Sequence, residues 1–372
     1  MPLQPQVSDH TNIYQPEFYR LSHANEEALF SGLLKGNPSI QIYDRIESQL
    51  TELIRINHPE RRFSKEELAA LQQQYIIDGS YDKFGVWVHY PWSQKVVHLL
   101  DEEDFIKVRT NRNQYKITPE ELQLLRSKKI GIIGLSVGQS IALTIATERI
   151  CGALHLADFD NIELSNLNRL SNANVFELGA LKVIVTARKI AELDPFLKVT
   201  CWTEGLTESN IDGFLGEGSS KLDILVEECD SIDIKILSRV KAREKKIPVV
   251  MDTNDKGMLD IERFDLEPKR PVLHGRIKEL ETMETTTLLQ KLKGLTIEEK
   301  VGYVAQMIGM ENISEEMKRS LPEMNKTIIG WPQLSSAVTL GAAMVTDICR
   351  RIALEKSNVS GRYFIDFNEL VN

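Results

Sequence analysis

The chain has 372 residues, of which 42% are hydrophobic and 27% charged, and this length allows two or three structural units with a sizeable core. Its formal net charge is −9, so the chain lacks the broad basic surface of generic nucleic-acid binders. This excludes nucleic acid as a main partner. Residues 1–20 show no apolar run behind a basic start, and the apolar stretch 334–348 is too short and polar to span a bilayer. We therefore expect a cytoplasmic protein with no membrane segment.

The cysteines are widely separated, with no CxxC pair and no histidine at metal-ligand spacing, so a structural zinc is not expected. Cys151, Cys201 and Cys229 lie in or beside apolar segments. We interpret these three as small core residues.

Residues 1–115 predict an α+β extension of unknown role. Helical periodicity covers residues 25–53 and 64–74, and the aromatic run FGVWVHYPW at 84–92 is typical of a strand. The aromatic residues can form either a recognition surface or a core strand, and we favour the core strand because such residues fit a half-buried pleat.

Residues 116–267 show the alternation of a doubly wound, Rossmann-like α/β domain, a parallel sheet with helices on both faces. Helical stretches near 138–150, 179–193, 207–215 and 231–246 separate the short apolar runs. These runs cover residues 129–134, 153–158, 198–203, 222–227 and 248–253. Ligands of such sheets bind at the carboxyl ends of the strands, which locates the expected site.

Residues 268–372 predict a helical segment that completes the core and a dimer interface. Charged helical stretches at 280–292 and 298–307 precede the helix at 334–348, whose Gly341, Ala342 and Ala343 allow close packing against a sheet or a second subunit. The alternating residues 361–367 predict a closing strand.

The first strand of the central domain ends at GLSVGQS, residues 134–140, where a phosphate-binding turn would open a helix. Gly134, Ser136 and Gly138 are the candidate phosphate contacts. The glycine pattern GxGxxG is incomplete, because Ser136 and Gln139 occupy its second and third positions. An ordinary strand-to-helix turn is therefore the alternative.

Asp158 ends the second strand, 24 residues after Gly134, near the distance at which a dinucleotide fold places the carboxylate that binds a ribose hydroxyl. A carboxylate at this position can instead cap the next turn.

The most specific motif is DFDNIELSNLNR at residues 158–169, followed by Lys182. Here the chain resembles the ThiF/MoeB/ubiquitin-activating enzyme superfamily, and this resemblance implies that Asp158, Asp160, Asn166, Arg169 and Lys182 surround ATP. Arg169 can bind phosphate oxygens in a bidentate manner, Lys182 adds a point charge and Asn166 can donate a hydrogen bond. A solvated helix face is the alternative for the two cations.

The resemblance also implies roles for Asp230 and Arg112. Asp230, in LVEECDS after the fourth strand, would help to hold Mg²⁺, although Ser231 follows it where the family usually has Asn. Arg112, in RTNRN, would reach across a homodimer to the partner's nucleotide, and an exposed arginine heading a helix is its alternative.

The function that the resemblance implies is ATP-dependent adenylation of a carboxylate, namely the C-terminus of a small ubiquitin-like protein or peptide, with release of pyrophosphate. No general base is needed, because a carboxylate is already ionised near neutrality. Without a convincing catalytic cysteine, we expect the acyl group to pass to another molecule, which leaves room for a separate downstream enzyme as a partner.

Two other functions stay open at this stage. A catalytically weak scaffold would account for the side chains at residues 136, 137 and 139, where the backbone must approach phosphate closely. An NAD-dependent oxidoreductase would use Asp158 but leaves Arg169, Lys182 and Asp230 without a role.

Overall fold

A computed structural model describes residues 12–76, 80–281 and 283–371, and the chain divides into two compact units. The first unit comprises Met1–Pro119 together with Ala191–Phe196, and the second comprises Glu120–Ile190 and Leu197–Asn372. The expected nucleotide site falls in the second unit.

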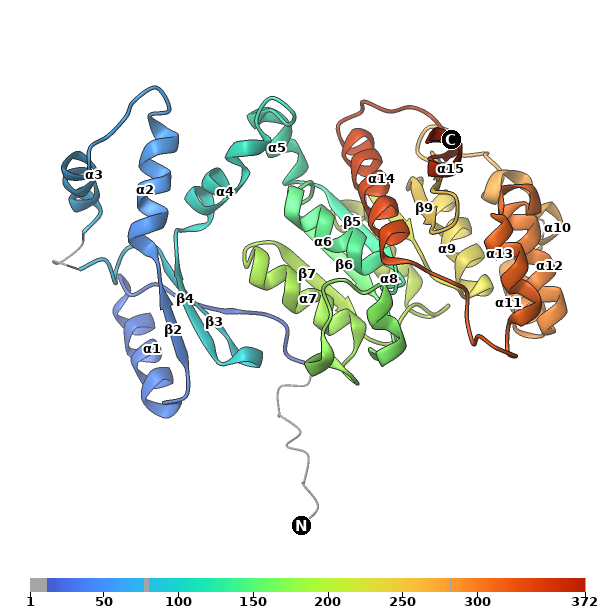
Figure 1. Cartoon of the computed structure of the whole chain (residues 1–372), viewed down its shortest axis with the longest axis horizontal. Coiled ribbons are helices and arrows are strands. Elements are labelled where there is room, and N and C mark those ends of the chain that lie inside the picture. Colours follow the sequence, from blue (N-terminus) through green and yellow to red (C-terminus); the bar gives the residue numbers. More distant parts are fainter. Residues whose placement is uncertain (1–11, 77–79, 282, 372) are drawn as a thin grey trace, which may run out of the picture. The chain divides into compact units, whose positions relative to one another are not determined.

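The first unit contains a four-stranded sheet of order β1-β3-β4-β2 (Figure 1). Its strands are β1 (Glu17–Tyr19), β2 (Gln41–Asp44), β3 (Val86–Tyr90) and β4 (Lys95–Leu99). Its helices are α1 (Ala24–Gly36), α2 (Ile46–Asn57), α3 (Lys65–Gln72) and α4 (Glu102–Thr110). Every residue of β3 is buried, which confirms the interpretation of the aromatic run as a core strand.

The predicted helix over residues 25–53 is wrong in its middle. Strand β2 interrupts it, after Gly36, Asn37 and Pro38 end α1. The strand pairs in parallel with β4, with Ile42 opposite Val96. Pairing with a strand that is distant in the sequence therefore overrides the local helical periodicity.

The second unit is built on a seven-stranded sheet of order β11-β10-β9-β8-β5-β6-β7. Strands β5 to β9 are parallel, and β10 and β11 extend the sheet by antiparallel pairing. The bounds are β5 (Lys129–Ile133), β6 (Ala153–Ala157), β7 (Lys198–Trp202), β8 (Ile224–Glu227), β9 (Val249–Thr253), β10 (Met258–Glu262) and β11 (Gly361–Phe364). The five predicted parallel strands and the closing strand are confirmed.

Helices cover both faces of this sheet, as two adjacent residues of β9 show. Met251 Sδ lies 3.4 Å from Lys235 Nζ of α9 (Ile232–Glu244), while Asp252 lies against Gly341 of α14 (Ser335–Ala353). Helix α14 packs on α6 (Gly138–Glu148), which is linked by a hydrogen bond to α7 (Lys182–Leu193). On the other face, α9 contacts α8 (Ile211–Leu215) and α11 (Thr285–Lys293). The doubly wound α/β fold is therefore confirmed.

The remaining helices of the second unit are shorter or lie outside the layers just described. They are α5 (Pro119–Leu125), α10 (Lys278–Glu281), α12 (Ile297–Ile308), α13 (Glu315–Ser320) and α15 (Phe367–Leu370). Among the described residues, no helix combines the length and apolar character needed to cross a bilayer.

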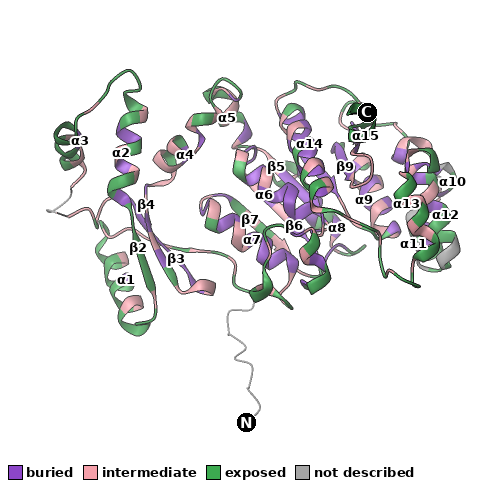
Figure 2. Cartoon of the chain, viewed as in Figure 1, coloured by how far each residue is buried: buried purple, intermediate pink, exposed green. Residues whose placement is uncertain are grey.

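The core of the second unit follows from the composition of its strands (Figure 2). Strand β8 is buried at all four positions, and β5 is buried from Ile130 to Ile133. Such near-continuous apolar runs are typical of parallel strands that are covered on both faces.

The small residues of α14 serve mainly to pack this helix on its own chain. Gly341 and Ala342 are buried, whereas Ala343 is exposed. A Cβ atom at Gly341 would overlap the carboxylate of Asp252 in the strand beneath. Gly341 is therefore required by the close approach of α14 to β9.

We predict that Gly341→Leu lowers the unfolding free energy of the second unit by about 1–3 kcal/mol or more, because overpacking moves either α14 or Asp252. Ala343→Leu is the matched control on the exposed side of the same helix, with an expected change within about 0.5 kcal/mol. Urea unfolding followed by circular dichroism measures both. Equal stabilities would show that α14 does not approach β9 this closely.

Candidate active site

The site begins where the strand order reverses. From β5 the chain continues to β6 and β7 on one side, whereas β8 and β9 lie on the other side of β5. The loops that follow β5 and β8 therefore meet at a topological switch point, where open α/β sheets bind ligands. A Cβ atom on Gly134 would lie 2.7 Å from the Glu228 carbonyl oxygen, and Gly134 has a φ of +82°. Only glycine satisfies both conditions.

The loop after Gly134 leads directly into α6, the first helix of the sheet. Gly138 opens this helix, and a Cβ atom there would lie 2.8 Å from Ile132 Cγ2 of β5. No side chain of the described residues caps the helix at Val137. Its first amide N–H groups and its dipole are therefore available to an anion.

The positions that lack glycine are accommodated without filling the loop. Gln139 is fully buried, and its Nε2 donates to Thr186 Oγ1 of α7 at 3.2 Å. Val137 is buried and lines a second pocket beyond the loop. Only Ser136 faces the expected nucleotide side, where its Oγ accepts a hydrogen bond from Arg169 Nε at 3.1 Å.

Asp158 ties the loop after β5 to the end of β6. Its Oδ2 accepts from Leu135 N at 2.6 Å and its Oδ1 accepts from Asp160 N at 2.8 Å. Burial raises its pKa, and the two N–H donors and Lys182 oppose this rise. Each carboxylate oxygen has a second lone pair, so Asp158 can hold the turn and still accept a ribose hydroxyl.

The acidic and amide residues of the motif that follows are held locally. Lys182 is buried, and its Nζ lies 2.8 Å from Oδ2 of the half-exposed Asp160. Asn166 is also buried, and its Oδ1 accepts from Glu163 N at 3.1 Å. The Asn166 carbonyl end therefore stabilises the turn that carries Arg169.

Arg169 connects this motif to both loops of the switch point. Besides Ser136, it donates to Asn168 Oδ1 at 3.0 Å. Partial burial lowers its pKa, while the negative charges of Asp230 and Glu163 counteract this effect. Arg169 is thus a cation close to both the glycine loop and Asp230.

A pocket of about 520 Å³ lies at this edge of the sheet. It is lined by the predicted site residues Gly134, Ser136, Asp158, Asp160 and Asp230. Phe159 and residues 204–208 also line it, and they were not among the predicted site residues. Their position directly after the ends of β6 and β7 was the available signal in the sequence.

The other predicted residues do not line this pocket. Arg169 is hydrogen-bonded to the pocket-lining Ser136, and Lys182 to the pocket-lining Asp160. Gly138 and Asn166 stabilise the neighbouring loops. Arg112 is exposed and belongs to the first unit, so its role across a homodimer stays a prediction.

Asp230 is the candidate metal ligand on the loop after β8. Its side chain is exposed, and the described residues contain no group of three or more His, Cys, Asp or Glu that could hold a metal ion. A single carboxylate nevertheless fits Mg²⁺, which takes its other ligands from phosphate oxygens and water.

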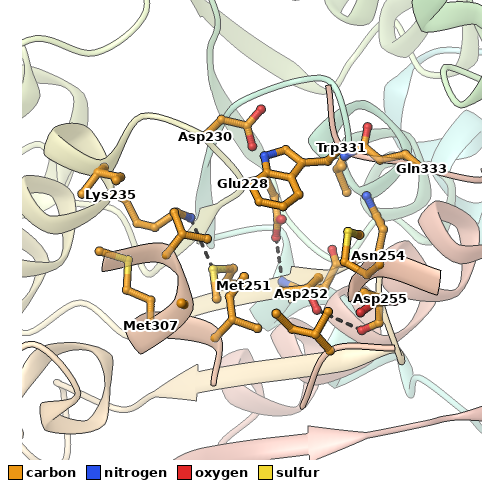
Figure 3. Close-up of a pocket in the computed structure, with 18 of the residues that line it drawn as sticks. Glu228, Asp230, Lys235, Met251, Asp252, Asn254, Asp255, Met307, Trp331 and Gln333 are labelled. Atoms are coloured by element: carbon orange, nitrogen blue, oxygen red, sulfur yellow. Dashed lines mark hydrogen bonds between the residues drawn. The ribbon is translucent and has the colours of Figure 1, made fainter. Parts of the chain in front are cut away.

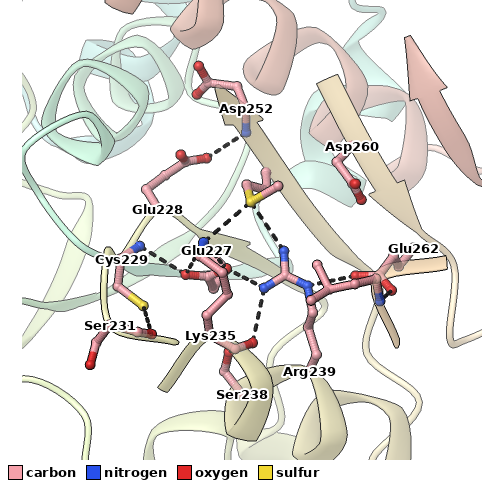
Figure 4. A network of polar contacts seen from close by, with 12 residues as sticks. Glu227, Glu228, Cys229, Ser231, Lys235, Ser238, Arg239, Asp252, Asp260 and Glu262 are labelled. Atoms are coloured by element: carbon pink, nitrogen blue, oxygen red, sulfur yellow. Dashed lines mark hydrogen bonds and ion pairs between the residues drawn. The ribbon is translucent and has the colours of Figure 1, made fainter. Parts of the chain in front are cut away.

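A buried ionic network supports the base of this loop (Figure 4). Glu227 forms ion pairs with Lys235 and Arg239 of α9, and Arg239 Nε lies 2.7 Å from Glu262 Oε2 of β10. Burial would raise the pKa of Glu227, but the two cations outweigh it and lower this pKa to about 2. Glu227 Oε1 also accepts from Cys229 N at 2.9 Å, so the network fixes the main chain just before Asp230.

The adjacent Cys229 is not an activated nucleophile. Burial, together with the charge of Glu227, raises the pKa of its thiol well above the ordinary value. A reactive cysteine requires the opposite shift. The thiol therefore stays protonated at neutral pH.

Glu228 points to the opposite side of the sheet from Glu227 and meets a second carboxyl group. Its Oε1 accepts from Asp252 N at 2.9 Å. Burial raises the pKa of Glu228 well above its usual range, and repulsion from Asp252 adds to this. Burial likewise raises the pKa of Asp252 to about 7.

Comparison with known proteins gives a match to the ThiF family over residues 109–325. The uncharacterized protein MT1398 of Mycobacterium tuberculosis is 38% identical over 342 residues, which cover 92% of this chain and 44% of that protein. The tRNA threonylcarbamoyladenosine dehydratase of Bacillus subtilis is 26% identical over 157 residues, which cover 42% of this chain and 60% of the relative. This chain thus spans about half the length of these relatives.

Among solved structures, the tRNA N6-threonylcarbamoyladenosine dehydratase TcdA of E. coli in complex with ATP is similar at 18% sequence identity. The match has a TM-score of 0.47 and covers 67% of this chain and 95% of TcdA. A likeness this distant does not bear on function.

We predict that Asp252→Asn flattens the pH dependence of stability. Between pH 3.8 and about 7 the native protein retains the Asp252 proton that the unfolded chain has lost. The native state then binds more protons, so its unfolding free energy falls as pH rises, by up to about 1.4 kcal/mol per pH unit. Asn cannot ionise, and urea unfolding across this window should give the variant a shallower slope. Parallel profiles would show that Asp252 titrates normally.

Proposed function

The chain belongs to the ThiF family, and from this premise we propose that it is an ATP-dependent adenylyltransferase that activates a carboxylate as an acyl-adenylate. The observation that carries the proposal is the convergence of the glycine loop, Asp158, Asp160 and Asp230 on one pocket at the switch point of the sheet. Such a pocket lies within the size range of small-molecule sites.

ATP would bind with its phosphates at the loop of residues 134–138. The amide N–H groups at the start of α6 would donate to phosphate oxygens, and Gly134 lets this loop lie close to the main chain of Glu228, which also lines the pocket. Asp158 would accept a ribose hydroxyl with its free lone pairs. The exposed Phe159 ring at the same pocket offers an apolar surface to the base.

Arg169 and Lys182 would stabilise the charge that develops on the α-phosphate. Arg169 already donates to Ser136 in the phosphate loop, and a bidentate contact with phosphate needs only a change of partner. Lys182 is held by Asp160, which orients its ammonium group towards the pocket-lining carboxylate. Catalysis would rest chiefly on positioning and electrostatic stabilisation.

Asp230 would hold Mg²⁺ together with the phosphates of ATP. It is exposed and lines the pocket, which fits a metal that needs one protein carboxylate. The ion would neutralise part of the triphosphate charge. The network around Glu227 would keep the loop of Asp230 in place for this contact.

The nucleophile would be the substrate carboxylate itself. One of its oxygens attacks the α-phosphorus, the bond from the α-phosphorus to the bridging oxygen breaks, and pyrophosphate leaves with the electron pair. No proton transfer is required, because the carboxylate is ionised near neutrality. The raised pKa of Cys229 favours transfer of the acyl group to another molecule over an internal thioester.

The substrate we propose is the C-terminus of a small protein or peptide. The dehydratase of Bacillus subtilis is named for a tRNA substrate, but the net charge of −9 of this chain favours a partner other than nucleic acid. A separate downstream enzyme, a homodimer and a cytoplasmic location belong to the same proposal.

A scaffold without activity is the second candidate, favoured by the side chain of Ser136 inside the loop. Against it, Val137 and Gln139 are buried away from the nucleotide pocket. The main chain of the loop therefore stays accessible to phosphate. An NAD-dependent oxidoreductase would leave Arg169 and Asp230 unexplained.

The proposal is tested by exchange of labelled pyrophosphate into ATP in the presence of Mg²⁺ and a panel of peptides. We expect Asp230→Ala to reduce exchange by at least about hundredfold, because a group that organises phosphate charge is lost. Glu244→Ala, at the far end of α9, is the matched control and should retain full exchange. If the wild-type protein shows no exchange and no magnesium-dependent ATP binding, this result would favour the scaffold.

A second test separates charge from geometry at Arg169. A hydrogen bond to a charged group contributes about 1.5–3 kcal/mol, so Arg169→Ala should slow adenylation by at least roughly tenfold. Arg169→Lys should restore only part of the rate, because an ammonium group lacks the planar fork of the guanidinium. Full activity of the Lys variant would reduce Arg169 to a general electrostatic contributor. Unchanged ATP affinity and rate in the Ala variant would remove it from the site.

A further inference from the structure

A second pocket, of about 190 Å³, lies beyond the loop of residues 228–231 (Figure 3). One wall is the end of β9 with Met251, and helix α12 provides another with Val304, Met307 and Ile308. Met317 and Trp331 complete an apolar lining. Unbranched methionine side chains let such a pocket adapt to apolar groups of different shape.

The second pocket adjoins the candidate active site through shared residues. Glu228, Cys229 and Asp230 line both pockets, so the loop after β8 is their common wall. A molecule whose carboxylate reacts beside Asp230 would therefore have its neighbouring groups close to the second pocket.

The charges at the second pocket disfavour an anionic occupant. Asp230 and Asp255 belong to its lining, and Lys235 is the one cation among the described lining residues. Lys235 Nζ is already engaged, at 2.8 Å from Glu227 Oε2. The carboxylate that reacts must therefore stay outside, and the part inside must be uncharged or cationic.

The buried polar atoms of the lining that have no hydrogen-bond partner in the described part of the chain indicate the kind of uncharged group, and they are Asn254 Oδ1 and the two carboxyl oxygens of Asp252. The side-chain oxygen of Asn254 is buried and has no hydrogen-bond partner among the described residues. It can accept a hydrogen bond from an N–H group, such as a peptide amide. A peptide with a large apolar C-terminal residue supplies both features.

The segment of residues 331–333, which lines the second pocket, is hydrogen-bonded to the motif that carries Arg169. Asn168 Nδ2 donates to the Gln333 carbonyl oxygen at 2.8 Å, and Gln333 and Trp331 both line the pocket. Another lining residue, Asp255, accepts a hydrogen bond with its Oδ2 from Ser314 N at 2.8 Å, at the start of α13. The pocket and the reactive centre are therefore parts of one connected structure.

We propose that the second pocket binds the apolar C-terminal side chain of the peptide or protein whose carboxylate is adenylated. The proposal rests on the proposed function and specifies its substrate: a C-terminal Phe, Met or Leu is preferred over Gly, and Glu or Asp is rejected. An apolar contact of this size supports discrimination of about tenfold or more.

The test compares the tripeptides Ala-Ala-Phe, Ala-Ala-Met, Ala-Ala-Gly and Ala-Ala-Glu in pyrophosphate exchange. We expect the Phe and Met peptides to exchange at least about tenfold faster than the Gly peptide at subsaturating concentration, with the Glu peptide slowest. Equal rates, or the highest rate with the Gly or Glu peptide, would overturn the proposal.

Variants of α12 link this preference to the pocket. Ala305 lines it, and Ala305→Trp should reduce the rate with the Phe peptide to that with the Gly peptide. Gln306→Trp, at the adjacent exposed position outside the pocket, should keep the preference. If the Ala305→Trp variant does not fold, Val301→Trp takes its place, because Val301 lies at the exposed rim of the pocket and a Trp there would also fill it. A preference that survives in the folded filled variant would contradict the proposal.

Ligand-observed NMR separates this proposal from the proposed function. Saturation transfer to the Phe ring of Ala-Ala-Phe should occur in wild type and be lost in the filled variant, whether or not exchange takes place. Transfer without exchange would reject adenylation and retain the pocket. Exchange with no transfer to the ring would retain adenylation and reject the pocket assignment.

Discussion

The site depends on the close approach of two main-chain segments at the ends of β5 and β8. Gly134 lies against the Glu228 carbonyl, and no other residue has both the space and the φ angle for this position. The approach places the loop of residues 134–138 and the loop of Asp230 at one edge, and Asp158 fixes the third segment by accepting from Leu135 N. Three segments that are distant in the sequence are thereby held within reach of one small ligand.

Two consecutive glutamates show how the sheet supports this edge from both faces. Glu227 faces α9 and is ionised, because Lys235 and Arg239 lower its pKa to about 2. Glu228 faces the other side, where burial and Asp252 raise its pKa well above the usual range. A buried ion pair is weak evidence for stability, but removal of one partner leaves an uncompensated charge. We therefore regard the Glu227 network as a device that fixes the main chain before Asp230.

The central fold could be predicted because its strands are buried on both faces and appear as short apolar runs between helices. The candidate site residues after β5 and β6 could be assigned to one edge of the sheet for the same reason, since such sheets bind ligands at the carboxyl ends of their strands. Strand β2 was missed because its pairing with β4 is not encoded in local periodicity, and β10 because its turn at Gly257 was not recognised. The hydrogen bond from Arg169 to Ser136 depends on side-chain direction, which spacing alone does not provide.

In the function proposed here, the two pockets would divide chemistry from recognition along the chain. Residues that would act on ATP come from the sheet and its first loops, whereas half of the lining of the second pocket comes from residues 301–333, between β10 and α14. The shared wall at residues 228–230 is held by the Glu227 network and does not depend on the identity of the apolar residues opposite. The apolar lining can therefore change shape without moving Asp230, and the proposed activity at the sheet edge would serve different C-termini when only the helical segment varies.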